Sequence, residues 1–246
     1  MISIRNAANM RLSGFTVAFD LDGTLIDTAP DLVGALNGVL QEEGFPSLSL
    51  DSSRFLVGRG ARVLIERGFA AAAAPLPEPR LDGLVDRFIE IYRARISLES
   101  RPFPGVETAL DVLRDEGARL AVCTNKPTDL ARQLLSELKL DGYFQAIVGG
   151  DAPPRPKPDA SHMIKAVTDA GGRIERSVMV GDSETDVGAA RASKAPVIVV
   201  PFGYTTTRPE DLGADWLAAH YDEIPGIVLD IALNRASPSA IGSAPG

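Results

Sequence analysis

The sequence predicts an α/β fold: a doubly wound parallel sheet with a small all-helical domain inserted after its first strand. From Gly105 onward, short apolar runs alternate with segments of helical periodicity. Alternation of this kind indicates a parallel sheet with right-handed crossovers. Before Gly105, a single apolar strand is followed by residues 28–100, which carry helical patterns and no strand signal. A chain of 246 residues is long enough for such a core and a modest insertion.

The first predicted strand is the apolar run that ends before Asp20. In the inserted segment we expect three helices, because apolar residues recur at helical spacing over residues 27–40, 57–69 and 81–96. The alanine-rich tract at 70–79 is expected to be a loop or a frayed helix end.

Pro102 and Pro104 predict a hinge where the chain returns to the sheet, because proline rigidifies a linker and removes hydrogen-bond donors. Beyond the hinge, helices and strands alternate. The predicted helices cover residues 106–116, 128–138, 160–170 and 186–192, with a closing helix at 224–233. The predicted strands cover residues 119–124, 146–148, 177–180 and 197–200.

These elements divide the chain into a catalytic core and an inserted helical domain. The core comprises residues 1–27 plus 101–235, and the helical domain comprises residues 28–100. Residues 236–246 are small residues, prolines and one isoleucine, which cannot bury enough apolar area to order themselves. We therefore expect a disordered tail there.

The composition is that of a water-soluble globular protein, with 45% hydrophobic and 24% charged residues. A net charge of −8 argues against a nucleic-acid-binding surface, which requires a basic face. The single cysteine, Cys123, excludes an intrachain disulfide and suits a reducing compartment. Neither a signal peptide nor a run of about 20 apolar residues is present. We expect a cytoplasmic protein that binds no membrane.

The most informative stretch is the end of the first strand, where Asp20 and Asp22 are followed by Gly23 and Thr24. Two carboxylates at the carboxyl end of a sheet strand lie where ligands of open α/β folds bind. Two like charges there need a cation, and Mg²⁺ takes carboxylate and carbonyl oxygens. One carboxylate of such a site could attack phosphorus.

Three further polar positions follow other strands or lie on adjoining loops. Thr124 follows the strand at 119–124, Lys157 lies between two prolines, and Asp182 and Asp186 come after the strand at 177–180. Taken singly, each has an ordinary structural explanation, such as a strand-end hydroxyl, a solvated lysine or a helix cap. Their joint occurrence in this order favours a phosphoryl-transfer site.

In these positions the chain resembles the haloacid dehalogenase-like hydrolase superfamily, whose phosphatases carry Asp-x-Asp-Gly-Thr where this chain has residues 20–24. The resemblance extends over about residues 15–233 and implies a Rossmann-like core with a helical cap. It implies that Asp20 is the nucleophile that becomes an aspartyl-phosphate, and that Asp22 is first a general acid and then a general base. Thr124 and Lys157 would bind the phosphoryl oxygens.

The resemblance also implies a set of metal ligands. Asp20, the backbone carbonyl of Asp22, and Asp182 would hold Mg²⁺. Asp186 would not bind the metal directly, but would contact metal-bound water or orient Lys157.

Within the superfamily, residues 57–65 resemble the cap segment of the phosphoglycolate phosphatases. Gly58 and Gly60 would let backbone amides approach a small carboxylate at a helix N-terminus, and Arg59 could add a charge-assisted contact. The alternative is that the glycines only shape a turn and that Arg59 faces water. Asn125 is a candidate phosphate donor, and Lys126 is a candidate for contacting the substrate carboxylate.

Three other residues receive predictions of a different kind. Lys194 stands where these relatives usually end a helix with glycine, so a positive φ is expected there at a cost to local stability. His162 and His220 have no cysteine or histidine partner at metal-ligand spacing, so we expect surface or helix-face roles for both.

The sequence thus predicts a Mg²⁺-dependent phosphomonoester hydrolase for a small phosphorylated metabolite, with 2-phosphoglycolate as the best single candidate. The alternatives on the same scaffold are a sugar-phosphate phosphatase, a pyrophosphatase and a β-phosphoglucomutase-like phosphotransferase. A hydrolytic dehalogenase is disfavoured because those relatives lack the second aspartate. A non-catalytic binding protein is disfavoured because Asp20, Asp22, Lys157 and Asp182 are all present. The oligomeric state is left open between monomer and homodimer.

Overall fold

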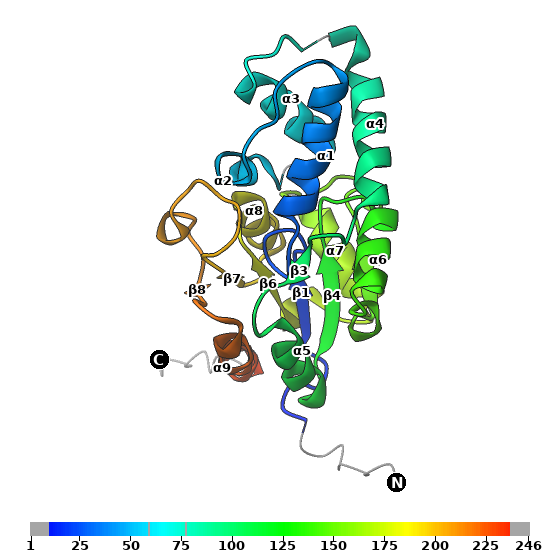
Figure 1. Cartoon of the computed structure of the whole chain (residues 1–246). Coiled ribbons are helices and arrows are strands. Elements are labelled where there is room, and N and C mark those ends of the chain that lie inside the picture. Colours follow the sequence, from blue (N-terminus) through cyan, green and yellow to red (C-terminus); the bar gives the residue numbers. More distant parts are fainter. Residues whose placement is uncertain (1–9, 59, 77, 237–246) are drawn as a thin grey trace, which may run out of the picture.

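The computed structural model describes residues 10–58, 60–76 and 78–236 and contains a six-stranded sheet with a group of helices at one end (Figure 1). The strand order is β5-β4-β1-β6-β7-β8, and every paired neighbour is parallel. The strands are β1 (Thr16–Phe19), β4 (Arg119–Cys123), β5 (Ala146–Val148), β6 (Ser177–Gly181), β7 (Val197–Val199) and β8 (Trp216–Leu217).

The centre of the sheet is β1, which lies between β4 and β6 with Phe19 in register with Val122 on one side and Val180 on the other. All four residues of β1 are buried. A strand buried on both faces needs no polar alternation, which explains the continuous apolar run in the sequence.

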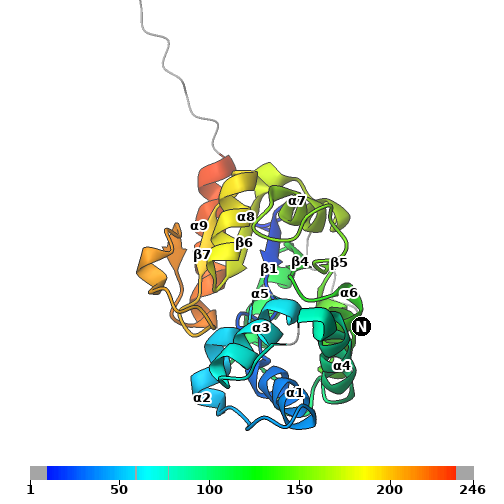
Figure 2. The same ribbon diagram turned by 90° about the horizontal axis from the view of Figure 1, so that it is seen from above.

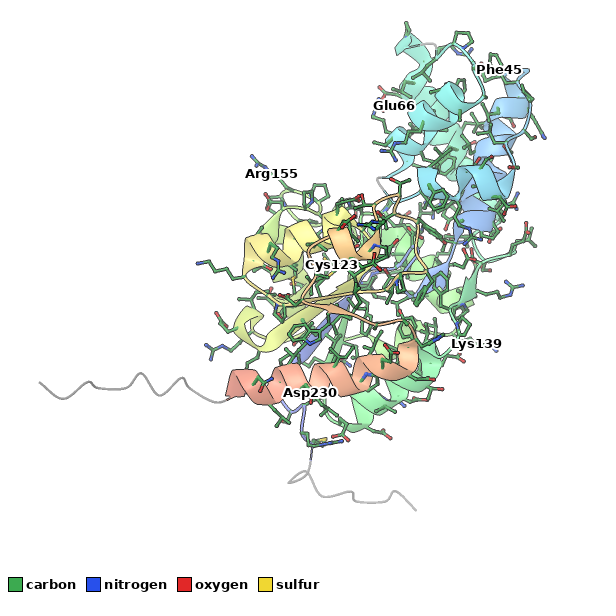
Figure 3. The ribbon with its side chains drawn as sticks, turned by 90° about the vertical axis from the view of Figure 1, so that its left-hand side faces the viewer. Phe45, Glu66, Cys123, Lys139, Arg155 and Asp230 are labelled. Atoms are coloured by element: carbon green, nitrogen blue, oxygen red, sulfur yellow. The ribbon has the colours of Figure 1, made fainter. Side chains whose placement is uncertain are left out.

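Helices cover both faces of the sheet, as the doubly wound prediction requires. One face packs against α5 (Val106–Asp115), α6 (Thr128–Glu137) and α9 (Ile224–Ala236). The other face packs against α7 (Ala160–Asp169) and α8 (Glu184–Ser193), which lie along one side of the sheet in Figure 2. Cys123 belongs to the second of these cores and is fully buried (Figure 3).

The helices inserted after β1 lie beyond the carboxyl ends of the strands (Figure 1). They are α1 (Ala29–Glu42), α2 (Leu50–Ser53), α3 (Ala61–Ala71) and α4 (Leu81–Ala94). Leu36, Phe69 and Phe88 are fully or almost fully buried among them. The helical segment therefore has apolar packing of its own, to which Phe45 contributes (Figure 3).

Two helix predictions in this segment had wrong starting points. The helix expected from residue 57 begins only at Ala61, because Gly58 and Gly60 have φ values of 106° and 88° that interrupt the helix. The helix expected from residue 27 begins at Ala29, because Asp27 is part of a strand.

That strand belongs to a small antiparallel sheet that the sequence did not predict. β2 (Ile26–Asp27) pairs with β3 (Arg101–Pro102) where the chain leaves the core and where it returns. Asp31 strengthens the same crossing, because its buried carboxylate accepts hydrogen bonds from the backbone N–H groups of Glu99 and Ser100 and from the Ser100 hydroxyl. At the expected proline hinge, the outgoing and the returning chain segments are thus paired as two antiparallel strands.

The remaining differences are at the carboxyl-terminal side. β8 was not predicted, because two residues carry no alternation signal. α8 begins at Glu184, earlier than the predicted 186, and α9 runs to Ala236. Ala236 therefore belongs to the helix and not to the predicted tail, and residues 237–246 lie outside the described residues.

No helix in the described part of the chain combines the length and the apolar character that crossing a membrane requires.

Lys194 has the left-handed conformation expected from the sequence, with φ 59° and ψ 28° directly after α8. In this left-handed region, a residue with a Cβ atom destabilises the fold by about 1 kcal/mol relative to glycine. We therefore expect Lys194→Gly to be about 1 kcal/mol more stable than Lys194→Ala in urea denaturation. Because both variants lose the same lysine contacts, their difference isolates the backbone term. Equal stability of the two variants would contradict it.

Candidate active site

The predicted polar residues meet at the carboxyl ends of three adjacent strands. Asp20 follows β1, Thr124 follows β4 and Asp182 follows β6. Since β1 pairs with both β4 and β6, the three positions lie at one edge of the sheet. Asp20 is held there by a backbone hydrogen bond of 2.9 Å from its N–H to the carbonyl of Val180.

Lys157 reaches this edge from the loop between β5 and α7. Its ammonium lies 2.9 Å from Asp20 Oδ1 and 2.6 Å from Asp186 Oδ1. Burial lowers the pKa of Lys157, but the attraction of Asp186 and Asp20 outweighs it, so that the pKa lies above its ordinary value. The lysine is therefore a permanent cation of the site and not the solvated loop residue of the alternative explanation.

Three buried acids surround this cation. Oxygen atoms of Asp20, Asp182 and Asp186 all lie within 4.8 Å of one another. Burial raises the pKa of Asp20 to about 7, against the lowering effect of Lys157, and burial together with Asp186 raises the pKa of Asp182. One ammonium does not balance three carboxylates in a low-dielectric environment.

The donor set fits a hard divalent cation. Carboxylate oxygens at one buried point, with too little positive charge around them, are the ligands that such cations take. Asp20 and Asp182 were both predicted as ligands, and both lie in this cluster. Among the described residues, this cluster does not include the side chain of Asp22. The predicted contact between the metal and the backbone carbonyl of Asp22 stays a prediction.

Asp182 is oriented by two other elements. Its Oδ1 accepts from the Thr24 hydroxyl at 3.1 Å, and its Oδ2 accepts from the Tyr204 N–H at 2.7 Å. Glycine is required at 203, because a Cβ there would lie 2.1 Å from Asp182 Oδ2. The segment 202–204 thus positions a candidate metal ligand.

Asp186 has both carboxylate oxygens engaged. Oδ1 accepts from Lys157, and Oδ2 accepts from the Ser183 hydroxyl at 2.7 Å and from the backbone N–H groups of Asp182 and Ser183. Of the two roles predicted for Asp186, the contacts favour the orientation of Lys157.

Asp22 faces the inserted helices and not the acid cluster. Lys126 donates to its two carboxylate oxygens at 2.8 and 3.0 Å, and the Thr28 hydroxyl donates to Oδ1 at 2.7 Å. Lys126, predicted to contact a substrate carboxylate, is therefore paired with Asp22 in this structure. Burial lowers the pKa of Lys126, but Asp22 more than compensates, and the pKa lies above its usual range.

Asn125 was predicted as a phosphate donor, but its side chain contacts the loop that carries Lys157. Its Oδ1 accepts from the Lys157 N–H at 2.9 Å, and its Nδ2 donates to the Lys157 carbonyl at 3.1 Å. Thr124 lies beside it, and its hydroxyl accepts from the Lys126 N–H at 3.2 Å. The side chain of Asn125 thus fixes a neighbouring loop.

Of the two roles expected for His162, the structure shows the helix-face position, because the residue is fully buried on the inner side of α7. Its Nδ1 accepts from the Lys157 N–H at 3.1 Å, and its Nε2 lies 3.1 Å from the carbonyl of Val148. Burial lowers the pKa of His162 to about 4, so that the ring is neutral and can accept at Nδ1. His220 is exposed, in line with the prediction.

The helical segment supplies the other wall of the site. A cavity of about 50 Å³ is lined by Asp20, Asp22 and Lys126 from the core and by Gly58 and Gly60 from the segment before α3. The predicted cap glycines and the acid pair therefore face one space. Arg59, the third member of the predicted cap motif, lies outside the described residues.

The profile of the family described as "Haloacid dehalogenase-like hydrolase" matches residues 17–200 of the chain. A phosphoglycolate phosphatase of Caulobacter vibrioides is 49% identical over 228 residues, which cover 93% of this chain and 96% of that protein. A phosphoglycolate phosphatase of Agrobacterium fabrum is 49% identical over 222 residues, which cover 90% and 95%.

Among solved structures, a predicted phosphoglycolate phosphatase of Haemophilus somnus superimposes with a TM-score of 0.81. It is 28% identical, and the match covers 88% of this chain and 98% of that one. The match therefore includes the inserted helices as well as the sheet.

The raised pKa of Asp20 predicts a pH dependence of stability. Without metal, Asp20 keeps its proton up to about pH 7 in the folded state, whereas the unfolded chain releases it near pH 4. Protonated Asp20 therefore stabilises the folded state at low pH, and this stabilisation is lost as pH rises through about 7. In EDTA, we expect the contribution of Asp20 to the free energy of unfolding to fall by about 0.8 kcal/mol between pH 6.5 and pH 8. His162 acts in the opposite direction, because its unfolded form takes up a proton near pH 6.5, and it offsets about 0.4 kcal/mol of this fall.

Mg²⁺ should stabilise the protein more at pH 8 than at pH 6.5, because the carboxylates must be ionised to bind it. Urea denaturation with EDTA and with saturating Mg²⁺ at the two pH values measures both effects. Asp20→Asn should reduce the pH dependence seen in EDTA. A metal-free stability that rises from pH 6.5 to pH 8 would show that the acid cluster is not strained.

Proposed function

This chain belongs to the haloacid dehalogenase-like hydrolase family and is a phosphoric monoester hydrolase, and we propose that its substrate is 2-phosphoglycolate. The observation that carries the proposal is the 49% identity, over at least nine-tenths of the chain, to two proteins that are both named phosphoglycolate phosphatase. The small cavity beside Asp20 and Asp22, of about 50 Å³, is consistent with a short leaving group.

We propose Asp20 as the nucleophile. Its Oδ1 accepts from the Leu21 N–H at 2.7 Å and lies 2.9 Å from the Lys157 ammonium, which fixes the plane of the carboxylate. The other oxygen can then approach phosphorus in line with the leaving group, which gives an aspartyl-phosphate. Lys157 and the Thr124 hydroxyl would hold the phosphoryl oxygens.

Asp22 is the group we assign to proton transfer. As the acid it would protonate the leaving oxygen, and as the base it would then take a proton from the attacking water. Its carboxylate lines the same cavity as Asp20, and Lys126 and Thr28 keep it on the side of the leaving group.

We propose that Asp20, Asp182 and the backbone carbonyl of Asp22 hold Mg²⁺. The bound ion would supply the missing positive charge, keep Asp20 ionised and withdraw charge from the phosphoryl oxygens. Asp186 acts through Lys157, whose ammonium it holds at 2.6 Å.

Residues 28–100 act in this proposal as a cap that closes the site, and residues 1–27 plus 101–235 act as the catalytic core. α1 to α4 lie over the carboxyl ends of the strands, and residues from α1, α3 and α4 line the cavity (Figure 1). A cap in that place excludes water from the aspartyl-phosphate and limits the size of the leaving group.

Phosphate release tests the substrate. With Mg²⁺, we expect kcat/KM for 2-phosphoglycolate to exceed that for sugar phosphates, nucleotides and pyrophosphate by more than about tenfold, and EDTA should abolish release. Faster turnover of a sugar phosphate or of pyrophosphate would show that the substrate is not 2-phosphoglycolate, while the assignment as a phosphatase would stand. Phosphoryl transfer between two sugar positions without release would instead support a mutase.

Substitution of the nucleophile tests the mechanism. Asp20→Asn keeps the size of the side chain but removes the attacking oxygen anion, so that we expect a loss of kcat of at least about 10³-fold with cooperative unfolding retained. Asp230→Asn is the matched control, because Asp230 is exposed on α9, away from the site (Figure 3). Residual turnover of Asp20→Asn within tenfold of the wild type would assign the nucleophile elsewhere.

A further inference from the structure

Tyr92 approaches the site from the cap and has no role in the mechanism above. It lies in α4, is 1% exposed, and lines the cavity that contains Asp20 and Asp22. Phe88, one turn earlier in α4, stacks on the Tyr92 ring with centroids 6.1 Å apart and planes 5° apart. The ring is thus held rigidly against the site.

Among the described residues, no group lies in hydrogen-bonding geometry with the Tyr92 hydroxyl. In the described part of the chain, three buried side-chain polar atoms lack a partner in such geometry: Thr16 Oγ1, Tyr92 OH and Arg176 Nε. Of these three residues, only Tyr92 lines the cavity. A buried hydroxyl without a partner costs free energy, and where it faces a cavity the missing partner can be a ligand.

The groups beside Tyr92 define the chemistry of that ligand. The ammonium of Lys126 lies 4.6 Å from the centroid of the Tyr92 ring. Lys126 has three N–H donors, and the Asp22 oxygens at 2.8 and 3.0 Å account for two of them. Burial raises the pKa of Tyr92 to about 12, so that the hydroxyl keeps its proton near neutral pH. The Tyr92 hydroxyl and the Lys126 ammonium are therefore two adjacent donors on residues that line one cavity.

Two donors, one of them charged, match an anionic acceptor with two oxygen atoms. Leu64, Phe88 and Leu130 add apolar wall to the cavity, and its volume of about 50 Å³ favours an anion carried on a short chain. We infer that the Tyr92 hydroxyl and the Lys126 ammonium bind the carboxylate of the leaving group, while Asp20 and Lys157 face the phosphoryl end. This inference rests on the proposed function. Tyr92 is thereby a specificity residue supplied by the cap.

Equilibrium binding of two unreactive ligands tests the inference on the full chain with Mg²⁺. 3-Phosphonopropionate has the shape of 2-phosphoglycolate with a methylene group in place of the bridging oxygen, and n-propylphosphonate lacks its carboxylate. By titration calorimetry, the wild type should bind the carboxylated ligand at least about tenfold more tightly. Tyr92→Phe should lose about tenfold in affinity for that ligand and less than about threefold for the other.

The matched control is Tyr143→Phe. The Tyr143 hydroxyl donates to Asp111 at 3.2 Å, and Tyr143 does not line the cavity. Tyr143→Phe should bind both ligands as the wild type does.

Two further measurements separate substrate recognition from a structural role. In steady-state kinetics, Tyr92→Phe should raise KM for 2-phosphoglycolate about tenfold and change kcat less. In urea denaturation without ligand, Tyr92→Phe should be at least as stable as the wild type, because no described group lies in hydrogen-bonding geometry with the hydroxyl it removes. A merely structural hydroxyl would instead lower stability and leave the ratio of the two affinities unchanged.

The outcomes distinguish this inference from the proposed function. If the wild type prefers the carboxylated ligand and Tyr92→Phe keeps the full preference, the inference is wrong and the proposed substrate class stands. Equal losses for both ligands in Tyr92→Phe also overturn it. If the wild type binds both ligands equally, the carboxylated substrate class and the inference fail together.

Discussion

The architecture of the site depends on an excess of buried negative charge at the carboxyl ends of β1 and β6. Asp20, Asp182 and Asp186 surround the single ammonium of Lys157. At an effective dielectric constant of about 20, two unit charges 4 Å apart interact by about 4 kcal/mol, so that one cation cannot offset three mutually repelling anions. The raised pKa values of Asp20 and Asp182 express that imbalance. A bound divalent cation would offset this excess of negative charge.

The Lys157 ammonium can offset the charge of the acids only if its position is fixed. Hydrogen bonds to the backbone of Lys157 fix it. Asn125 bonds both the N–H and the carbonyl of Lys157, and His162 accepts from the same N–H. Within the described residues, neither side chain forms a hydrogen bond with Asp20, Asp182 or Asp186. Both act by positioning, and His162 can do so because its ring stays neutral.

Tyr204 connects the acid cluster with the inserted helices. The Tyr204 N–H donates to Asp182, while the Tyr204 hydroxyl donates to Asp27 and accepts from the N–H groups of Thr28 and Ala29 at the start of α1. The start of α1 and a candidate metal ligand thus contact the same residue. The paired strands β2 and β3 and the Asp31 carboxylate hold together the two chain segments that join the inserted helices to the sheet.

The sequence by itself determined the α/β class, the inserted helices and the identity of the acids and the lysine at the strand ends. These features depend on local periodicity and on polar residues that directly follow buried strands, as at Asp20 and Asp182. Local patterns could not reveal β2, β3 and β8, because strands of two residues carry no period.

Only the tertiary structure decided which groups face one another. Lys126 pairs with Asp22 across 104 positions of the chain, and Lys157 pairs with Asp186 across 29. His162 and Tyr92 occupy helix positions that the sequence cannot distinguish from surface or ordinary core. Their roles arise because strand order and crossovers bring distant segments together, and burial and pKa depend on those neighbours and not on the residues adjacent in sequence.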